Sequence, residues 1–356
     1  GEFTRRAVLA GKLDLLQAEA VADLVSARWR SEQRSALAQL DGGLSRRVLA
    51  LRDGLLEVEA LVAYDIDFPE EDDGPVPRER VLAAVDRTLA ALDGLLATAR
   101  AGELVHEGAL VVIAGEPNVG KSSLFNALLG RRRAIVTEIA GTTRDAIEAA
   151  VDGTRWPLRL VDTAGLRETS DQVERLGIEV SAEYLRRADV VLACGDDDRS
   201  LAHVVSACAA LTEAAVVAVR TKSDLRGAPP NEHDVAEPEG ARDRTNAHAI
   251  APVAVSAETG VGIAALVEAI EGVLDARVDA PPPDAPLLTR ARHERAVREA
   301  REELAAFRRG WAEEGLPATV AAVHLRAGAH ALETLVGGID VEEVLERVFE
   351  RFCVGK

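Results

Sequence analysis

The sequence has few aromatic residues and few cysteines, and it has no methionine. Aromatic side chains make up 3% of the 356 residues, so leucine, valine, isoleucine and alanine must fill the cores, and this composition with many Glu and Arg favours helices. The cysteines Cys194, Cys208 and Cys353 are widely spaced, which indicates neither a disulfide framework nor a zinc site. Because the sequence begins at Gly1 without an initiator methionine, we expect it to be part of a longer chain.

Basic residues and long apolar runs are also scarce. Against 60 Asp and Glu there are 42 Lys and Arg, for a net charge of -18, which argues against broad nonspecific binding to nucleic acid but leaves room for a local basic patch. No apolar run reaches transmembrane length, and the start does not resemble a signal peptide. With 47% hydrophobic residues, we expect a soluble, cytoplasmic protein of two or three domains that does not contact a membrane.

Helical periodicity at both ends of the chain encloses a region in which strands and helices alternate. Apolar residues recur at helical spacing over 12–29, 32–64, 81–104 and 288–352. Short apolar strands are predicted at 110–114, 158–162, 189–194, 215–220 and 251–255, a pattern typical of a mostly parallel sheet with helices on both faces. We therefore expect an α/β nucleotide-binding domain (106–280) inserted into an all-α helical domain (1–105 and 281–356).

The stretch GEPNVGKSS, residues 115–123, matches the phosphate-loop pattern G-x-x-x-x-G-K-[ST]. It lies between a predicted strand and a predicted helix, the context that this motif requires. Gly115 and Gly120 allow backbone N–H groups to point at phosphates, Lys121 reaches the β- and γ-oxygens, and Ser122 offers its hydroxyl to Mg²⁺. We expect the neighbouring residues Asn118, Val119 and Ser123 to contact the nucleotide as well. The competing interpretation is a glycine-rich turn without a ligand.

Two further segments suit the γ-phosphate and the magnesium ion. Asp162, at the end of a predicted strand, would hold the magnesium shell, and Gly165 of the same DTAG stretch can donate its backbone N–H to the γ-phosphate; a buried or capping Asp is the alternative. The stretch AGTTRD supplies a threonine for Mg²⁺ and the γ-phosphate, Thr143 in our interpretation, with Thr142 as the alternative. Leu166 follows DTAG where Ras-like proteins carry the glutamine that orients the attacking water, so another group must do so.

The stretch TKSD, Thr221 to Asp224, predicts which base is bound. The Asp224 carboxylate can accept hydrogen bonds from guanine N1–H and the exocyclic amine, whereas adenine presents an acceptor at N1, so this motif selects GTP over ATP. Lys222 belongs to the same motif. Its usual first residue is Asn, and the departure to Thr221 is expected to loosen the cover over the base without changing the base that is read. Ser256 and Ala257 resemble a loop that closes over guanine with backbone donors.

These motifs, together with the flanking segments, resemble the tRNA modification GTPase family MnmE, also called TrmE. The resemblance spans the whole chain and includes the segments GEFTRRAVLAGKLDLLQAEAVADLV, DFPEED, GEPNVGKSSLFNALLG, TEIAGTTRD, DTAGLRETSDQVERLGIE and FCVGK. It implies GTP hydrolysis coupled to modification at C5 of the tRNA wobble uridine (cmnm5U34), with an MnmG-like flavoprotein as partner. In that family a folate-binding N-terminal domain precedes the GEFT stretch, so folate would enter only through a domain that this sequence lacks.

The resemblance also suggests how the missing glutamine is replaced. It implies that two GTPase domains form a homodimer across GTP and that K⁺ supplies the positive charge of an arginine finger. Asn118 corresponds to a K⁺ ligand, and backbone carbonyls of the loop Thr137 to Gly141, Ile139 among them, cap the ion next to Thr142. Glu174 corresponds to the residue that orients the water, so the catalytic set is Glu174, Lys121 and Gly165. By composition alone, Glu174 is an ordinary helical surface acid.

Two other functional classes remain open on the sequence. A ribosome-assembly GTPase can share the phosphate loop and the hydrophobic residue after DTAG, but it typically carries an RNA-binding module after the GTPase domain, and here that segment is acidic and amphipathic. A dimerisation scaffold switched by nucleotide, with little turnover, is the other class. The thiol of Cys353 is associated with the modification site in the family, and its role, catalytic or packed, stays open because no base adjoins it in the sequence.

Overall fold

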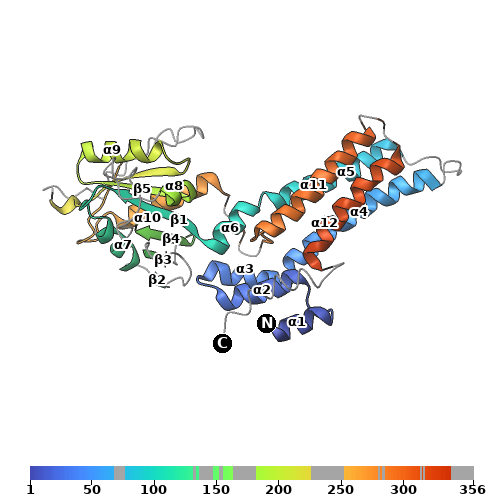
Figure 1. The fold of residues 1–356 in the computed structure, drawn as a ribbon, viewed down its shortest axis with the longest axis horizontal. Coiled ribbons are helices and arrows are strands. Elements are labelled where there is room, and N and C mark those ends of the chain that lie inside the picture. The colour runs from blue at the N-terminus through green and yellow to red at the C-terminus, as the bar shows by residue number, and fades with distance from the viewer. Residues whose placement is uncertain are drawn as a thin grey trace. The chain divides into compact units, whose positions relative to one another are not determined.

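The chain folds into a helical unit and an α/β unit (Figure 1). The structure, a computed structural model, describes residues 1–67, 77–130, 134–135, 147–151, 155–162, 182–225, 252–279, 281–282, 285–312, 315 and 317–337. The helical unit consists of Gly1–Ala27, Ser31–His106 and Pro281–Lys356, and the α/β unit of Arg28–Arg30 and Glu107–Ala280. An α/β domain therefore interrupts a helical domain, and the predicted fold class is confirmed.

The predicted helical pattern over 12–29 corresponds to one helix, whereas the patterns over 32–64 and 81–104 each correspond to two. The first helices are α1 (Glu2–Leu9), α2 (Leu15–Ser26), α3 (Arg30–Leu40), α4 (Gly43–Asp67), α5 (Arg78–Leu96) and α6 (Ala99–Glu107). The pattern over 32–64 breaks at Gly42, whose φ of 81° lies in the left-handed region that suits a helix end. The start of α2 is a capping box: the Asp14 side chain accepts from the N–H of Gln17, whose side chain accepts from the N–H of Asp14.

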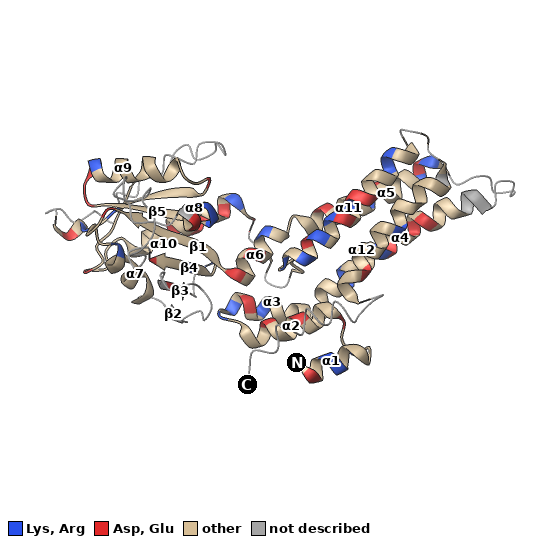
Figure 2. Ribbon diagram, viewed as in Figure 1, with Lys and Arg blue, Asp and Glu red and all other residues tan. Residues whose placement is uncertain are grey.

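The core of the helical unit lies between α4, α5, α11 (Ala291–Ala312) and α12 (Ala318–Val336). Its buried side chains are mostly Leu, Val and Ala, with Phe307 as a large aromatic member that stacks on Trp311. Acidic and basic residues recur along these helices (Figure 2). Arg301 pairs with Asp93 and Arg308 with Asp86, so α11 and α5 are joined by ion pairs at their exposed edges as well as by apolar packing.

Several charged residues are nevertheless buried where α2 meets the start of α11. The Glu19 carboxylate lies 2.7 Å from Nε2 of His293 and accepts a 3.0 Å hydrogen bond from Arg292. Burial raises the pKa of Glu19, but the hydrogen bond and charge of His293, with the charges of Arg292 and Arg290, outweigh it and lower the pKa to about 2. The nearby Asp23 pairs with Arg290. This buried ionic cluster joins segments that are far apart in the sequence.

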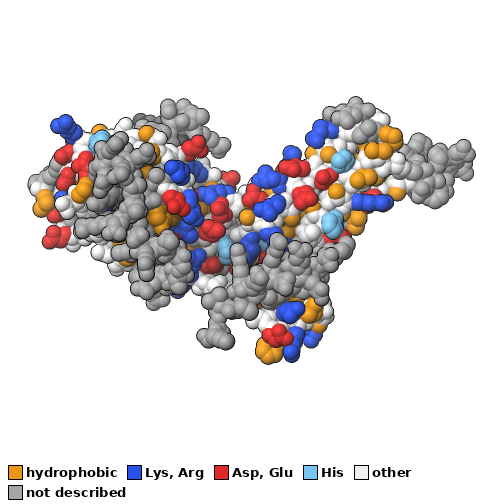
Figure 3. Space-filling model, in the orientation of Figure 1, with side chains coloured by type: hydrophobic (Ala, Val, Ile, Leu, Met, Phe, Trp, Pro, Cys, Tyr) orange, Lys and Arg blue, Asp and Glu red, His pale blue; other side chains and the backbone are white. Residues whose placement is uncertain are grey.

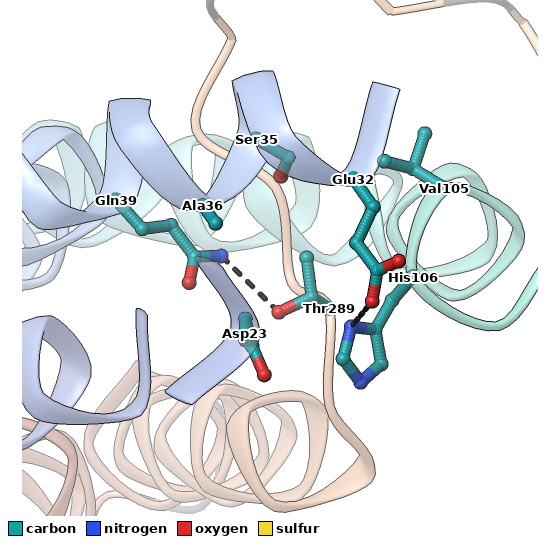
Figure 4. A pocket seen from close by; sticks show the side chains of 8 residues that line it. All are labelled: Asp23, Glu32, Ser35, Ala36, Gln39, Val105, His106 and Thr289. Atoms are coloured by element: carbon teal, nitrogen blue, oxygen red, sulfur yellow. Dashed lines mark hydrogen bonds and ion pairs between the residues drawn. The ribbon is translucent and has the colours of Figure 1, made fainter. Parts of the chain in front are cut away.

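Next to this cluster, α2, α3 and α6 enclose a small polar cavity (Figure 4). Its volume is about 10 Å³, which suits a single water molecule. The Gln39 amide donates to the Thr289 hydroxyl at 3.1 Å, and His106 lies 3.5 Å from Glu32. The lining residues are Asp23, Glu32, Ser35, Ala36, Gln39, Val105, His106 and Thr289. His106 precedes the α/β unit along the chain and Thr289 follows it. The segments before and after the inserted domain therefore both line this cavity.

The α/β unit is built on a seven-stranded sheet in the order β2-β3-β4-β1-β5-β6-β7. The strands are β1 (Ala109–Gly115), β2 (Ala134–Ile135), β3 (Ile147–Val151), β4 (Leu158–Asp162), β5 (Val190–Gly195), β6 (Ala215–Arg220) and β7 (Val253–Ala254). Neighbouring strands in the row β4-β1-β5-β6-β7 are parallel, whereas β3 is antiparallel to both β2 and β4. The strands β2 and β3 were not predicted, because short strands without a continuous apolar run give a weak signal in the sequence.

Helices cover both faces of this sheet (Figure 1). They are α7 (Lys121–Gly130), α8 (Ala182–Arg187), α9 (Asp198–Ala209) and α10 (Ile263–Arg277), with a short 3-10 helix, η3 (Ser223–Leu225). Leu110, Val112 and Ala114 of β1 pack in one apolar cluster with residues of α8 and α9, and alternation along the strand directs Val111 and Ile113 to the opposite face. Because every residue of β1 is buried, the loop after this strand begins from a rigid support.

The turn Arg28–Arg30 belongs to the α/β unit, although its neighbours along the chain belong to the helical unit. Trp29 is buried, and a Cβ atom on Gly108 would lie 2.8 Å from its ring. Gly108 has a φ of 81°, so both the close approach and the backbone conformation require glycine. The sequence did not predict this contact, because a single buried aromatic residue produces no periodic pattern.

The surface of the described part of the chain carries both signs of charge. On the face in Figure 3, acidic and basic side chains are interspersed among apolar ones. Within the described residues, no helix is both long enough and apolar enough to cross a membrane. The same residues contain no group of three or more His, Cys, Asp or Glu side chains arranged to hold a metal ion.

Candidate nucleotide-binding site

The predicted phosphate loop connects β1 to α7. Within it, Asn118 has a φ of 61° and Gly120 a φ of 100°, and such left-handed residues turn successive backbone N–H groups toward one side. A Cβ on Gly115 would lie 2.7 Å from the carbonyl oxygen of Cys194 on β5, so only glycine fits at the end of β1. The loop therefore has the backbone shape of an anion-binding turn at a helix N-terminus.

Lys121 begins α7 and is buried, with 3% of its surface exposed. Its ammonium donates to the carbonyl oxygens of Gly115 at 3.0 Å and of Glu116 at 2.8 Å. These carbonyls keep the buried charge hydrogen-bonded, as burial requires. Ser122 and Ser123 follow in the exposed first turn of α7, and Val119 is buried beneath the loop.

The pairing of β1 with β4 brings Asp162 to the same edge of the sheet. Asp162 is the last residue of β4 and lies opposite Ile113, two positions before Gly115. The residue is 3% exposed. A buried carboxylate is therefore placed beside the phosphate loop by the register of two parallel strands.

The TKSD motif follows β6 and is hydrogen-bonded to the phosphate loop. Thr221 is buried, and its hydroxyl donates to the carbonyl oxygen of Val119 at 2.6 Å. Its backbone N–H donates to the carbonyl oxygen of Gly195 at 2.9 Å. Although threonine replaces the usual asparagine, the motif and the loop are joined directly. Asp224, in η3, is exposed and accessible to a ligand.

The turn that contains Ser256 and Ala257 lies next to the TKSD motif. The N–H of Ser223 donates to the carbonyl oxygen of Val255 at 3.1 Å, and the N–H of Val255 donates to that of Arg220 at 2.8 Å. Ser256 is buried, and its hydroxyl accepts from the N–H of Thr259 at 3.2 Å. The two segments predicted to enclose the base are therefore connected through their backbones.

Two non-glycine residues at this edge of the sheet have left-handed backbone conformations. Among the residues that the structure describes, Asn118 and Lys222 are the non-glycine residues with positive φ, at 61° and 54°. Such conformations are unfavourable for ordinary side chains and tend to occur at functional sites. Their occurrence in the predicted phosphate loop and in the predicted base motif agrees with a ligand site here.

Several predicted site residues lie outside the described part of the chain. They are Thr137, Ile139, Thr142, Thr143, Gly165, Leu166 and Glu174, and the C-terminal Cys353. The described candidates, from Asn118 to Ser123 and from Thr221 to Asp224, with Asp162, Ser256 and Ala257, follow the carboxyl ends of β1, β4, β6 and β7. The structure thus brings together the residues predicted for phosphate, magnesium and base.

Two features of this edge were not predicted from the sequence. Asp196, directly after β5, forms an ion pair with Lys222 of the TKSD motif, and the run of acids from Asp196 to Asp198 at a strand end could have indicated it. Cys194, at the end of the same strand, is fully buried, and this burial raises its pKa to about 12. It therefore remains a neutral thiol at physiological pH and packs against the phosphate loop.

Known proteins of one family resemble this chain over its whole length. Residues 15–353 match the family described as the MnmE helical domain. The tRNA modification GTPase MnmE of Aquifex aeolicus (strain VF5) is 40% identical over 360 residues, which cover 100% of this chain and 76% of the relative. The proteins of the same name from Azoarcus sp. (strain BH72) and Laribacter hongkongensis (strain HLHK9) are each 42% identical over 362 residues, which cover 100% of this chain and 75% and 76% of the relatives. The chain belongs to the MnmE family.

Proposed function

We propose that the protein hydrolyses GTP, and that hydrolysis is stimulated by K⁺, requires dimerisation of the GTPase domains and serves the C5 modification of the tRNA wobble uridine. The observation that carries the proposal is the hydrogen bond from Thr221 to the phosphate loop. It joins a loop suited to phosphates with a motif suited to guanine in one site. The name of the family's relatives, tRNA modification GTPase, supports the same activity.

The phosphate loop is suited to the triphosphate. Lys121 now donates to loop carbonyls at 2.8 and 3.0 Å, and phosphate oxygens would offer it stronger, charge-assisted acceptors in the same space. The N-terminus of α7 adds backbone N–H groups and the positive end of a helix dipole. Val119 and Ser123 frame this loop. Gly165 is proposed to donate its N–H to the γ-phosphate.

The residues beside the loop also suit a magnesium ion. Mg²⁺ prefers hard oxygen ligands, and the hydroxyl of Ser122 and the buried carboxylate of Asp162 supply such oxygens at this edge. Thr143, or Thr142 in its place, would complete the set. Held by these oxygens together with GTP, Mg²⁺ would neutralise the negative charge that develops during phosphoryl transfer.

At the other end of the site, Asp224 is proposed to select guanine. Its carboxylate is exposed, and it can accept two hydrogen bonds that adenine cannot donate. Lys222 provides an aliphatic surface beside the base, and Ser256 and Ala257 provide backbone donors next to it.

K⁺ is proposed to replace the arginine finger, and Glu174 to replace the missing glutamine. Asn118 is exposed and held in a left-handed conformation, so its amide oxygen is free to face an ion beside the phosphates. Thr137, Ile139 and Thr142 are proposed as the other ligands, in a loop that a second GTPase domain orders. Glu174 would then orient the water that attacks the γ-phosphate.

A tRNA and an MnmG-like flavoprotein are proposed as the partners, and folate would enter through an additional N-terminal domain. The experiment is to measure multiple-turnover GTPase activity in KCl and in NaCl at several protein concentrations, with Lys121→Ala as the inactive control. We expect turnover in KCl that rises with protein concentration and little in NaCl. Negligible turnover in both salts would instead support a nucleotide-switched scaffold. Activity stimulated by ribosomal subunits but not by tRNA with the flavoprotein would support the ribosome-assembly alternative.

A further inference from the structure

An acidic turn lies between the phosphate loop and the base motif. It consists of Asp196, Asp197 and Asp198 and follows β5, the strand between β1 and β6. Three adjacent carboxylates beside a site for a polyanion would repel the ligand unless their charges were compensated. The structure shows how each carboxylate is used.

Each acid of this turn has a different partner. Asp197 caps α9 by accepting from the N–H of Ser200 at 2.8 Å. Asp198 forms an ion pair with Arg220, the last residue of β6. Asp196 lies 3.1 Å from the ammonium of Lys222. Asp196 is therefore the acid of this turn that holds a side chain of the base motif.

The side chain of Lys222 extends across the phosphate loop. A Cβ on Gly120 would lie 4.0 Å from Cε of Lys222, so the aliphatic stem passes beside the glycine that precedes Lys121. The backbone of Lys222 has a φ of 54°, and Asp196 holds the far end of the same side chain. Both ends of Lys222 are thus fixed before a nucleotide binds.

We propose that Asp196 is a positioning residue that holds Lys222 extended across the phosphate loop, so that the surface for guanine is formed in advance. The proposal rests on the proposed GTP-binding function. Asp196 acts through Lys222 and does not contact the reacting atoms. Without it, Lys222 must be ordered when the nucleotide binds, and that cost weakens binding. Nucleotide release should therefore accelerate and KM should rise, while kcat at saturating GTP should stay constant.

The opposite effect would follow if Asp196 acted only as a negative charge near the phosphates. Removing that charge would then tighten nucleotide binding. Asp198→Asn is the matched control, because it removes the same charge from the same turn without touching Lys222. The two variants therefore separate positioning from the general electrostatic field.

The experiment measures the release of N-methylanthraniloyl-GDP by stopped flow after mixing with excess GDP, along with steady-state GTP hydrolysis. For Asp196→Asn we expect release about two- to five-fold faster, the range of a partly exposed ion pair, with kcat unchanged. Asp196→Glu should restore part of the slow release, and Asp198→Asn should release at the parent rate or more slowly. Equal acceleration in both Asn variants, or slower release in Asp196→Asn, would overturn the proposal.

A double-mutant cycle with Lys222→Met isolates the pair. If Asp196 acts through Lys222, Asp196→Asn should have no further effect in the Lys222→Met background, and a full effect there would contradict the proposal. Binding of the fluorescent GDP to the parent protein is measured first. Absence of binding would overturn the proposed function together with this inference, whereas binding with unchanged release in Asp196→Asn overturns the inference alone.

Discussion

The hydroxyl of Thr221 donates a 2.6 Å hydrogen bond to the backbone carbonyl of Val119, across 102 residues of sequence. Both residues are buried. This bond links the strand that carries the base motif to the loop that is suited to phosphate. It shows how threonine can take the place of asparagine in this motif without separating the two halves of the site.

Loss of the Thr221 hydroxyl should weaken nucleotide binding. Thr221→Val keeps the shape of the side chain but leaves the buried carbonyl of Val119 without this donor, which typically costs about 1–3 kcal/mol. We expect GDP affinity to fall by about five- to a hundred-fold, as measured by isothermal titration calorimetry. Thr221→Ser should retain the bond and bind close to the parent level. Equal affinities for the Val and Ser variants would show that the hydroxyl is not needed.

The choice of base should depend on Asp224. We expect the parent protein to bind GTP well and ATP poorly, because adenine offers an acceptor where the carboxylate needs a donor. Asp224→Asn should weaken GTP binding and favour xanthosine nucleotides, whose base presents an oxygen in place of the exocyclic amine. Competition binding with GTP, ATP and XTP measures this change. Equal binding of ATP and GTP by the parent would contradict the assignment of Asp224.

Turnover should depend on the cation and on Glu174. Stabilisation of transition-state charge is commonly worth about 10³-fold or more in phosphoryl transfer, so Asn118→Ala and Glu174→Ala should each lower kcat in KCl by at least about ten- to a hundred-fold. GTP affinity should change little, and Leu166→Gln should not restore the rate in NaCl. If Glu174→Ala hydrolyses GTP at the parent rate in KCl, the catalytic group must be sought between Gly141 and Asp145.

The buried cluster around Glu19 should make the helical unit sensitive to acid. The folded pKa of Glu19 is about 2, below its ordinary value of 4.5, so its stabilising contribution is present above pH 4.5 and is lost as the pH falls toward 2. Burial lowers the pKa of His293 as well. The contribution of this neutral imidazole to folding stability is therefore present above its ordinary pKa of 6.5 and declines as the pH falls below that value. Burial raises the pKa of Asp23 above its ordinary value of 3.8. The contribution of Asp23 to folding stability is therefore present below that value and is lost as the pH rises.

Glu19→Gln isolates the contribution of this carboxylate. Removing one partner from a buried ion pair typically costs about 3–5 kcal/mol, so we expect a loss of this order in the free energy of unfolding at pH 7. The difference between variant and parent should shrink below pH 4.5. Urea denaturation followed by circular dichroism from pH 7.5 to pH 3 measures both quantities. Glu2→Gln, in an exposed i,i+4 pair with Arg6, is the control and should change stability by less than about 1 kcal/mol. A pH-independent difference for Glu19→Gln would mean that packing, not charge, accounts for the loss.

The fold could be predicted from the sequence where the signal was long and periodic. The strands β1, β5 and β6 have continuous apolar runs, and the flanking helices have clear apolar stripes, so their positions agreed with the structure to within a few residues. Two helical patterns were wrong in extent, since the pattern over 32–64 contains the separate helices α3 and α4, and the pattern over 81–104 contains α5 and α6. Apolar spacing continues across the first of these breaks, which the glycines at 42 and 43 mark in the sequence and the left-handed backbone of Gly42 produces. The strand β3 was missed because its pairing with β4, not its own composition, defines it.

The sequence by itself determined the chemistry of the site's separate parts, because a phosphate loop and a base motif are each local patterns of a few residues. The tertiary structure alone decided how these parts are joined. Thr221 meets Val119, Lys222 meets Asp196, and His293 meets Glu19 across 102, 26 and 274 residues of sequence. Such contacts depend on the order and register of strands and on the packing of helices. No local pattern encodes them, because burial of apolar surface over the whole domain decides which distant residues become neighbours.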